Sequence, residues 1–299
     1  MTTYRAATPA DEPGLHALWA VCFAAPQLLP LYRSDPDRLP RTMVAEGSDG
    51  VEAVVYWLPR RVRNAEGGID LVGGVANVAT RPDARGRGHI RSLLGMALES
   101  MSEAGCDWSL LFTGSPGVYE SSGYKVFSQS LTRGPLAAAT RDTSGVRRAS
   151  VAEWPLLAEL YDRHNAHRPL TTVRSRRTGP QGAGPLHDSF DLRLAEGSRE
   201  LRGPARHDPH RWRCWMAVAP VPSWFPSCFV VPPEASRPPG ACRVTRAEAR
   251  LTPGEPALPF LFAELETVAD TSGMARPLAV DPSPTLASPS AIHWVADYF

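Results

Sequence analysis

Four residues, Arg85, Gly86, Arg87 and Gly88, stand where a run of strand-forming residues gives way to a helical pattern. The first N–H groups of a helix have no partner within the helix and lie at the positive end of its dipole, so they suit an anion such as a pyrophosphate. The glycines would let the backbone approach that anion closely, and the arginines would add charge and forked donors. The turn therefore predicts a phosphate site, with a solvent-exposed basic loop as the alternative.

Other familiar sites do not fit the sequence. The phosphate loop of nucleotide triphosphatases is absent, and G-x-G-x-x-G fails because Arg91 occupies its last position. Ser115 lacks the G-x-S-x-G context of a hydrolase nucleophile. His207 and His210 are separated by Pro209, which breaks a helix, and no further ligand is close in sequence, so no metal site is expected.

The first half of the chain alternates strand and helix patterns around this turn, an α+β order in which a central helix crosses between two strands. Strands are expected at 3–8, 42–47, 51–63, 71–80, 107–114 and 124–131, and helices at 9–23 and 88–104 with a short helical turn at 118–123.

Two motifs in this half resemble those of the GNAT superfamily of N-acetyltransferases. "RGRGHI" at 85–90 is similar to the family's acetyl-CoA motif, R/Q-x-x-G-x-G/A, except that Ile90 replaces its last small residue. "YESSGY" at 119–124 is similar to the later segment Y-x-x-x-G-F/Y. The resemblance covers roughly residues 3–131, and two motifs in the right order are much more specific than either one alone.

The resemblance implies acetyl-CoA as co-substrate, with no metal, and direct transfer in a ternary complex. It assigns the acetyl and pantetheine arm to the backbone of the preceding strand and the pyrophosphate to the turn, with His89 contributing only its N–H. Tyr119 matches the family's proton donor, and packing is the expected role of Tyr124. The implied cofactor-binding residues are Val78, Ala79, Thr80, Arg85, Gly86, Arg87, Gly88, His89 and Ile90.

The general base is not settled by the motifs. Many family members carry a carboxylate on the strand before the turn, but here 71–80 offers only Asn77. The sequence also resembles the enhanced-intracellular-survival type of this family, which uses its own C-terminal carboxylate after a terminal Phe. Phe299 is thus a catalytic candidate, with a terminal aromatic strand or an ordered water molecule as alternatives.

An internal similarity indicates two domains. The segment Arg5–Trp19 aligns without gaps with Arg147–Tyr161, and a polar linker lies at Thr140–Val146. Residues 1–140 are therefore expected to form an acetyl-CoA-binding GNAT domain, and 141–299 a degenerate GNAT-like domain that shapes the acceptor site. Each would have a mixed, mostly antiparallel central sheet flanked by helices. Pro259–Gly273 resembles the helix after the turn in its apolar spacing.

The amino-acid composition argues against some classes of binding partner and indicates a location in the cell. Lys and Arg number 32 against 31 Asp and Glu, which argues against a nucleic-acid or membrane-surface binder. The five cysteines are scattered and no signal peptide is evident, which favours a reducing, cytoplasmic location.

The expected acceptor is a primary amine of a small molecule, such as an aminoglycoside or another natural product, because the Pro-rich second half suggests a covered pocket. A protein lysine or N-terminus as acceptor, and a non-catalytic CoA sensor, remain alternatives. The oligomeric state stays open, a homo-oligomer included.

Overall fold

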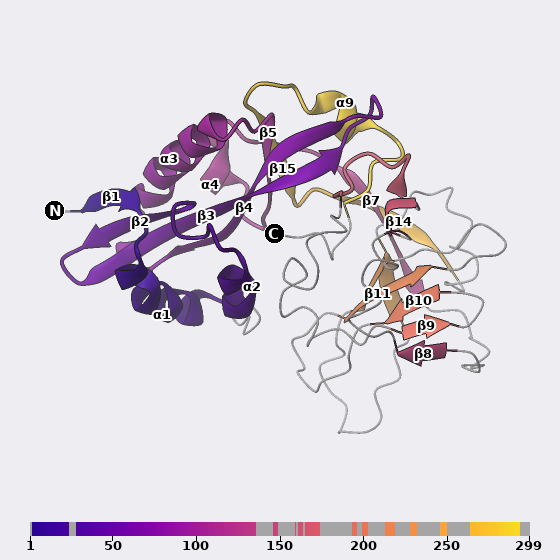
Figure 1. The fold of residues 1–299 in the computed structure, drawn as a ribbon, viewed down its shortest axis with the longest axis horizontal. Coiled ribbons are helices and arrows are strands. Elements are labelled where there is room, and N and C mark those ends of the chain that lie inside the picture. Colours follow the sequence, from indigo (N-terminus) through magenta and orange to yellow (C-terminus); the bar gives the residue numbers. More distant parts are fainter. Residues whose placement is uncertain are drawn as a thin grey trace. The chain divides into compact units, whose positions relative to one another are not determined.

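The computed structural model describes residues 2–23, 28–135, 146–148, 159, 161–163, 165–173, 193–195, 199–202, 213–218, 228–231, 246–249 and 264–293. The chain forms two compact units (Figure 1). The first contains residues 1–128 together with the C-terminal segment Thr271–Ala287, and the second contains Gln129–Asp270 and 288–298. The expected boundary at 140 placed Thr271–Ala287 with the second half of the chain, whereas its strand pairs within the first unit.

The first unit is built on a seven-stranded sheet in the order β1-β2-β3-β4-β5-β15-β6. All neighbours are antiparallel except β4 and β5, which are parallel. The predicted mixed, mostly antiparallel sheet is confirmed. Its strands are β1 (Thr3–Ala6), β2 (Thr42–Gly47), β3 (Gly50–Arg63), β4 (Ile69–Thr80), β5 (Trp108–Phe112), β6 (Lys125–Val126) and β15 (Gly273–Pro277).

The strand β15 reaches this sheet from the far end of the sequence. It pairs with β5 along its whole length, from Gly273 opposite Phe112 to Pro277 opposite Trp108, and with β6 on its other side. Met274 is fully buried there, between two strands that are near neighbours in the sequence. The sheet is continuous between β5 and β6 only because β15 fills that position.

Helices cover both faces of the sheet (Figure 1). Helix α3 (His89–Glu103) buries the apolar stripe Leu93, Leu94, Ala97, Leu98 and Met101 against Val55 and Trp57 of β3. On the other face, α1 (Glu12–Cys22) packs Leu15, Leu18 and Trp19 against the alternate β3 residues Val54 and Tyr56. The period-2 alternation of β3 thus supplies both cores, as expected for a sheet covered on both sides.

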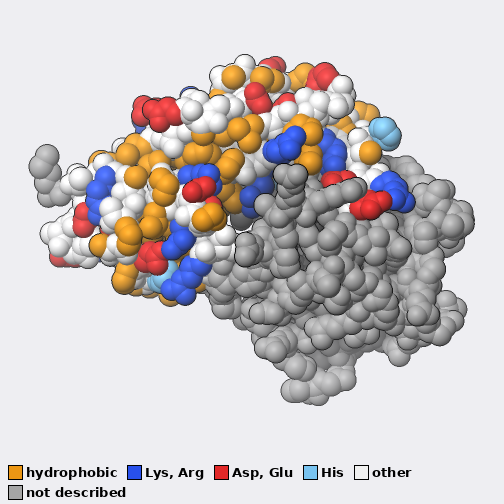
Figure 2. Space-filling model, in the orientation of Figure 1, with side chains coloured by type: hydrophobic (Ala, Val, Ile, Leu, Met, Phe, Trp, Pro, Cys, Tyr) orange, Lys and Arg blue, Asp and Glu red, His pale blue; other side chains and the backbone are white. Residues whose placement is uncertain are grey.

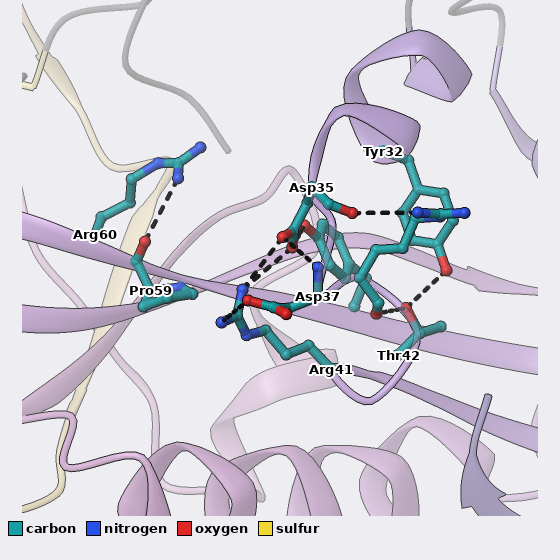
Figure 3. A network of polar contacts seen from close by, with 9 residues as sticks. Tyr32, Asp35, Asp37, Arg41, Thr42, Pro59 and Arg60 are labelled. Carbon is teal, nitrogen blue, oxygen red and sulfur yellow. Dashed lines mark hydrogen bonds and ion pairs between the residues drawn. The ribbon is translucent and has the colours of Figure 1, made fainter. Parts of the chain in front are cut away.

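A polar network fixes the segment between helix α2 (Leu28–Ser34) and β2 (Figure 3). The Asp35 carboxylate accepts the hydroxyl of Tyr56 at 2.7 Å and lies 3.3 Å from the Arg41 guanidinium. Burial, followed by the hydrogen bond to Asp35, raises the pKa of Tyr56 well above its usual value, so the phenol stays protonated. The network ties the loop to the middle of β3.

The second unit contains a six-stranded antiparallel sheet, in the order β10-β11-β12-β13-β7-β14. These strands are β7 (Gln129–Pro135), β10 (Arg199–Arg202), β11 (Arg213–Val218), β12 (Cys228–Val231), β13 (Arg246–Ala249) and β14 (Glu266–Asp270). Beyond this sheet, β8 (Val146–Arg148) pairs with β9 (Arg193–Ala195).

Two sequence predictions are wrong in this region. The strand expected at 124–131 is divided into β6 and β7, which belong to different sheets. The helical pattern at Pro259–Gly273 contains the strand β14, because Thr267 and Val268 pair with β7 and this tertiary pairing overrides a helical spacing. Most of the second copy of the sequence repeat, and most of the expected linker, lie outside the described residues.

Surface charge is mixed in the described part of the chain. On the face shown in Figure 2, acidic and basic side chains are interspersed with apolar ones. None of the helices within the described ranges has the length and apolar character needed to cross a membrane.

One buried ion pair gives a testable pH dependence. Arg5 of β1 binds the buried Asp11 carboxylate through two hydrogen bonds of 2.7 Å and lowers the pKa of Asp11 to about 2. A lowered pKa means that the stabilisation is complete above the unfolded value near 4 and is lost as the pH falls through about 2. We expect Asp11→Asn to destabilise the chain by ~1–2 kcal/mol at pH 7. Urea unfolding should show this difference shrinking between pH 4 and 2, and a pH-independent difference would contradict it.

Candidate functional site

The β4 strand is distorted where the sequence predicted cofactor contacts. Val54 of β3 lies opposite Ala79, but Tyr56 lies opposite Ala76, so β4 carries an extra residue and bulges. Asn77 has φ 52° within the bulge, and its carbonyl accepts the indole N–H of Trp19 at 2.9 Å. A bulge bends a strand and redirects its backbone groups, which is frequent beside functional sites.

The edge of β4 that faces β5 is paired only near the start of β4, and the rest of that edge is unpaired. The parallel ladder runs from Val72 opposite Trp108 to Gly74 opposite Leu110 and then ends. Among the described residues, no strand takes this edge over Val75–Thr80. It therefore offers backbone donors and acceptors over the stretch that contains the predicted Val78, Ala79 and Thr80.

The predicted phosphate turn leads directly into α3. After a short 3₁₀ helix (Pro82–Ala84), Gly86 and Gly88 adopt φ of 76° and 80°, and α3 begins at His89. Both glycines are exposed, and the first turn of α3 has no acidic residue. Side chains other than glycine rarely adopt such φ values, so the glycines set the backbone of the turn. No side chain caps the N-terminus of α3, so its first N–H groups are not taken up by a side-chain acceptor, as an anion site requires.

The arginines of the turn differ in their partners. The Arg87 guanidinium donates to the Asp83 carbonyl at 2.9 Å and lies 3.6 Å from Glu52, and Arg81 is paired with Asp83 at 2.7 Å. Arg85 is exposed and has no acidic partner within the described part of the chain; its Nε reaches only the Thr80 carbonyl, at 3.5 Å. Arg85 is thus the arginine of the predicted motif that is available to a ligand.

The remaining two cofactor candidates point into the protein. The His89 side chain is buried and its Nδ1 lies 2.9 Å from the Tyr4 hydroxyl. Ile90 is half-buried and packs on the α3 core, which gives a place to the bulky residue that departs from the motif. Sequence reasoning missed Tyr4 and Glu52 as neighbours of the turn, because neither belongs to a motif.

The candidate acid Tyr119 lies on the short helix α4 (Gly117–Glu120), inside the same core as α3. Its ring meets that of Tyr124 edge-on, with centroids 6.2 Å apart. Burial raises the pKa of the Tyr119 phenol, and a hydrogen bond with the Thr113 side chain offsets part of that rise. The phenol therefore carries its proton at neutral pH, as any proton donor must.

Tyr124 has a different environment. Its hydroxyl lies 2.7 Å from Ser109 Oγ, which in turn donates to the Gly73 carbonyl at 2.8 Å. Tyr124 therefore links β4, β5 and the segment after α4, and this supports the structural role expected for it.

Phe299 lies outside the described residues, so the general base stays a prediction, as does the alternative of a water molecule. Within the described ranges, no group of three or more His, Cys, Asp or Glu residues is arranged to hold a metal ion.

Comparison with known proteins relates the first half of the chain to a known family. Residues 3–127 match the family model described as "Acetyltransferase (GNAT) domain". No curated protein sequence matches the chain.

Several solved structures share the fold. A GCN5-related N-acetyltransferase from Kribbella flavida aligns over 93% of this chain and 72% of its own, with 18% identity and a TM-score of 0.67. Eis1 from Mycobacterium abscessus aligns over 93% and 74%, with 15% identity and a TM-score of 0.60. A GCN5-related N-acetyltransferase from Anabaena variabilis aligns over 98% and 70%, with 14% identity and a TM-score of 0.54. At these identities the likeness establishes the fold.

Proposed function

We propose that this chain transfers the acetyl group of acetyl-CoA to the primary amine of a small molecule, because residues 3–127 match the GNAT acetyltransferase domain. One observation carries the proposal. A turn with two left-handed glycines precedes α3 and follows a bulged strand, β4, whose edge toward β5 is unpaired beyond Gly74. The turn suits a pyrophosphate, and the strand edge suits the amide groups of the pantetheine arm.

The cofactor would use mainly backbone groups of the protein. The N–H groups of 86–90 would bind the pyrophosphate, and Arg85 would add a charged contact from the exposed side of the turn. The arm would continue along Val78–Thr80 by hydrogen bonds of the kind that join strands, which places the thioester near the bulge at Asn77.

The chemistry proposed is a direct transfer. The neutral amine attacks the thioester carbonyl carbon, the tetrahedral intermediate expels the thiolate, and the amine loses its proton to the general base. Tyr119 donates its phenolic proton to the departing sulfur and regains one from solvent. Its burial keeps the phenol protonated at neutral pH.

The decisive experiment uses the full chain. Isothermal titration first measures binding of CoA and acetyl-CoA, and a thiol-release assay then compares small polyamines and aminoglycosides with lysine-bearing peptides. Thiol release with a small amine supports the proposal. Release with peptides alone would make the chain a protein acetyltransferase, and binding without release a sensor. Absence of CoA binding would contradict all three.

A glycine substitution tests the turn itself. At Gly88 a Cβ meets nothing within 4 Å, so Gly88→Ala changes only the backbone preference at φ 80°. A left-handed alanine costs ~1–2 kcal/mol, and we expect the Kd of CoA to rise about tenfold as the turn relaxes. Gly95→Ala is the matched control, since Gly95 lies inside α3 with equal space and without a left-handed φ. Equal Kd values for the two variants would contradict the assignment of the turn.

A further inference from the structure

A buried carboxylate lies beneath the phosphate turn. Glu52 stands at the start of β3, where its carbonyl accepts the N–H of Arg81, and its side chain is 8% exposed. Three basic side chains face that carboxylate: Arg81 at 3.7 Å, Arg87 at 3.6 Å and His89 at 3.4 Å. All three belong to the single segment 81–89, so one carboxylate contacts the entry, the middle and the exit of the turn.

The carboxylate occupies a space that the fold keeps for it. A Cβ placed on Gly47, in the neighbouring strand β2, would collide with both the Oε1 atom and the carboxyl carbon of Glu52. Thr2 donates its hydroxyl to Oε2 at 3.1 Å. A carboxylate this buried is tolerated only where cations and donors compensate for its lost hydration, so Glu52 and the turn stabilise each other.

His89 connects this acid to the start of α3. Tyr4 of β1 lies within hydrogen-bond distance of Nδ1, and Nε2, which is buried, faces Glu52. Tyr4 thus orients the ring at Nδ1, whereas Nε2 makes no hydrogen bond and has the Glu52 carboxylate 3.4 Å away. The backbone N–H of His89 is the first of the helix.

We propose that Glu52 is a positioning residue for the phosphate groups of coenzyme A, an inference that rests on the proposed function. It does not touch the cofactor. It holds Arg87 and His89 so that the N–H groups of 86–90 stay convergent before the anion arrives, and preorganisation of this kind lowers the cost of binding. It also pairs with Arg81 and Arg87, whereas Arg85 and Arg91, which have no acidic partner in the described ranges, remain available to anions.

The test compares Glu52→Gln with Glu46→Gln in the full chain. Glu46 is an acid of β2 that pairs with Arg5 at 2.8 Å and is 43% exposed. Each variant is titrated with CoA and with pantetheine, which carries the same thiol arm without phosphates. We expect Glu52→Gln to raise the Kd of CoA five- to twentyfold and to leave that of pantetheine unchanged, and Glu46→Gln to change neither.

Two further variants guard against simple misfolding. Tyr4→Phe loosens His89 without altering Glu52, and we expect a two- to fivefold rise in the Kd of CoA. In the double variant Glu52→Gln/Arg87→Gln the effects should be less than additive, because the two side chains act through one contact. A CoA Kd that is unchanged or lower in Glu52→Gln, or a loss shared equally by pantetheine, would overturn the inference. A wild-type chain that fails to bind CoA would instead refute the proposed function.

Discussion

Met274→Asp is expected to destabilise the first unit by ~4 kcal/mol or more, a large part of the stability of a typical domain. Met274 is fully buried in β15, opposite Leu111 of β5 and Val126 of β6. The aspartate would lose the apolar contacts of the methionine and would leave a charge without a partner in the core. Urea unfolding measures the loss.

The matched control is Val280→Asp, a few residues downstream on the same segment. Val280 is 43% exposed, and we expect a change within ~0.5 kcal/mol. Equal stabilities for the two variants would contradict the placement of β15 in the core.

The same strand predicts the behaviour of a shortened chain. A chain that ends at Ser128 lacks β15, which leaves β5 and β6 with unpaired edges inside the sheet. Exposed edges of this kind promote aggregation, so we expect the fragment to be insoluble, and co-expression with residues 265–299 to restore part of its solubility. A soluble, cooperatively unfolding fragment 1–128 would show that β15 is dispensable.

The sequence predicts local features well and long-range pairing poorly, for a physical reason. The glycine turn and the apolar stripe of α3 each depend on residues that are close together in the sequence, so both can be recognised before any fold is known. The strand at 273–277 was missed because its partner, β5, lies some 160 residues earlier and no local pattern encodes that pairing. The strand at 266–270 was mistaken for a helix for the same reason, because its pairing with the distant β7 has no local sequence pattern.

The candidate site divides in the same way. The Arg-Gly turn and Tyr119 were found by motif, and the bulge at Asn77 became visible only as a register shift between two strands. Glu52 and Tyr4 reach the turn because β1, β2 and β3 place them there, although they lie 37 and 85 residues from His89 in sequence. Residues that support a binding site from beneath carry no motif, since many different side chains could fill that role.

Tyr119→Phe is expected to lower kcat by about 10²-fold or more while the Kd of CoA changes less than twofold. The substitution removes one oxygen atom and leaves the ring in its packing with Tyr124. Without the phenolic proton, the thiolate must leave as an anion, which slows expulsion from the tetrahedral intermediate. The measurement is a steady-state rate with acetyl-CoA and the amine identified by the thiol-release assay.

Tyr124→Phe is the matched control, because it removes the same atom from the neighbouring ring. The Tyr124 hydroxyl bonds Ser109, so its loss should reduce stability by ~1 kcal/mol, with kcat nearly unchanged.

The pH profile separates the two roles further. Burial raises the pKa of Tyr119, so the wild-type rate should persist into alkaline pH and fall only where that phenol ionises. That alkaline limb should vanish in Tyr119→Phe and remain in Tyr124→Phe. Equal kcat values for Tyr119→Phe and the wild type would show that another group donates the proton and that Tyr119 only packs in the core.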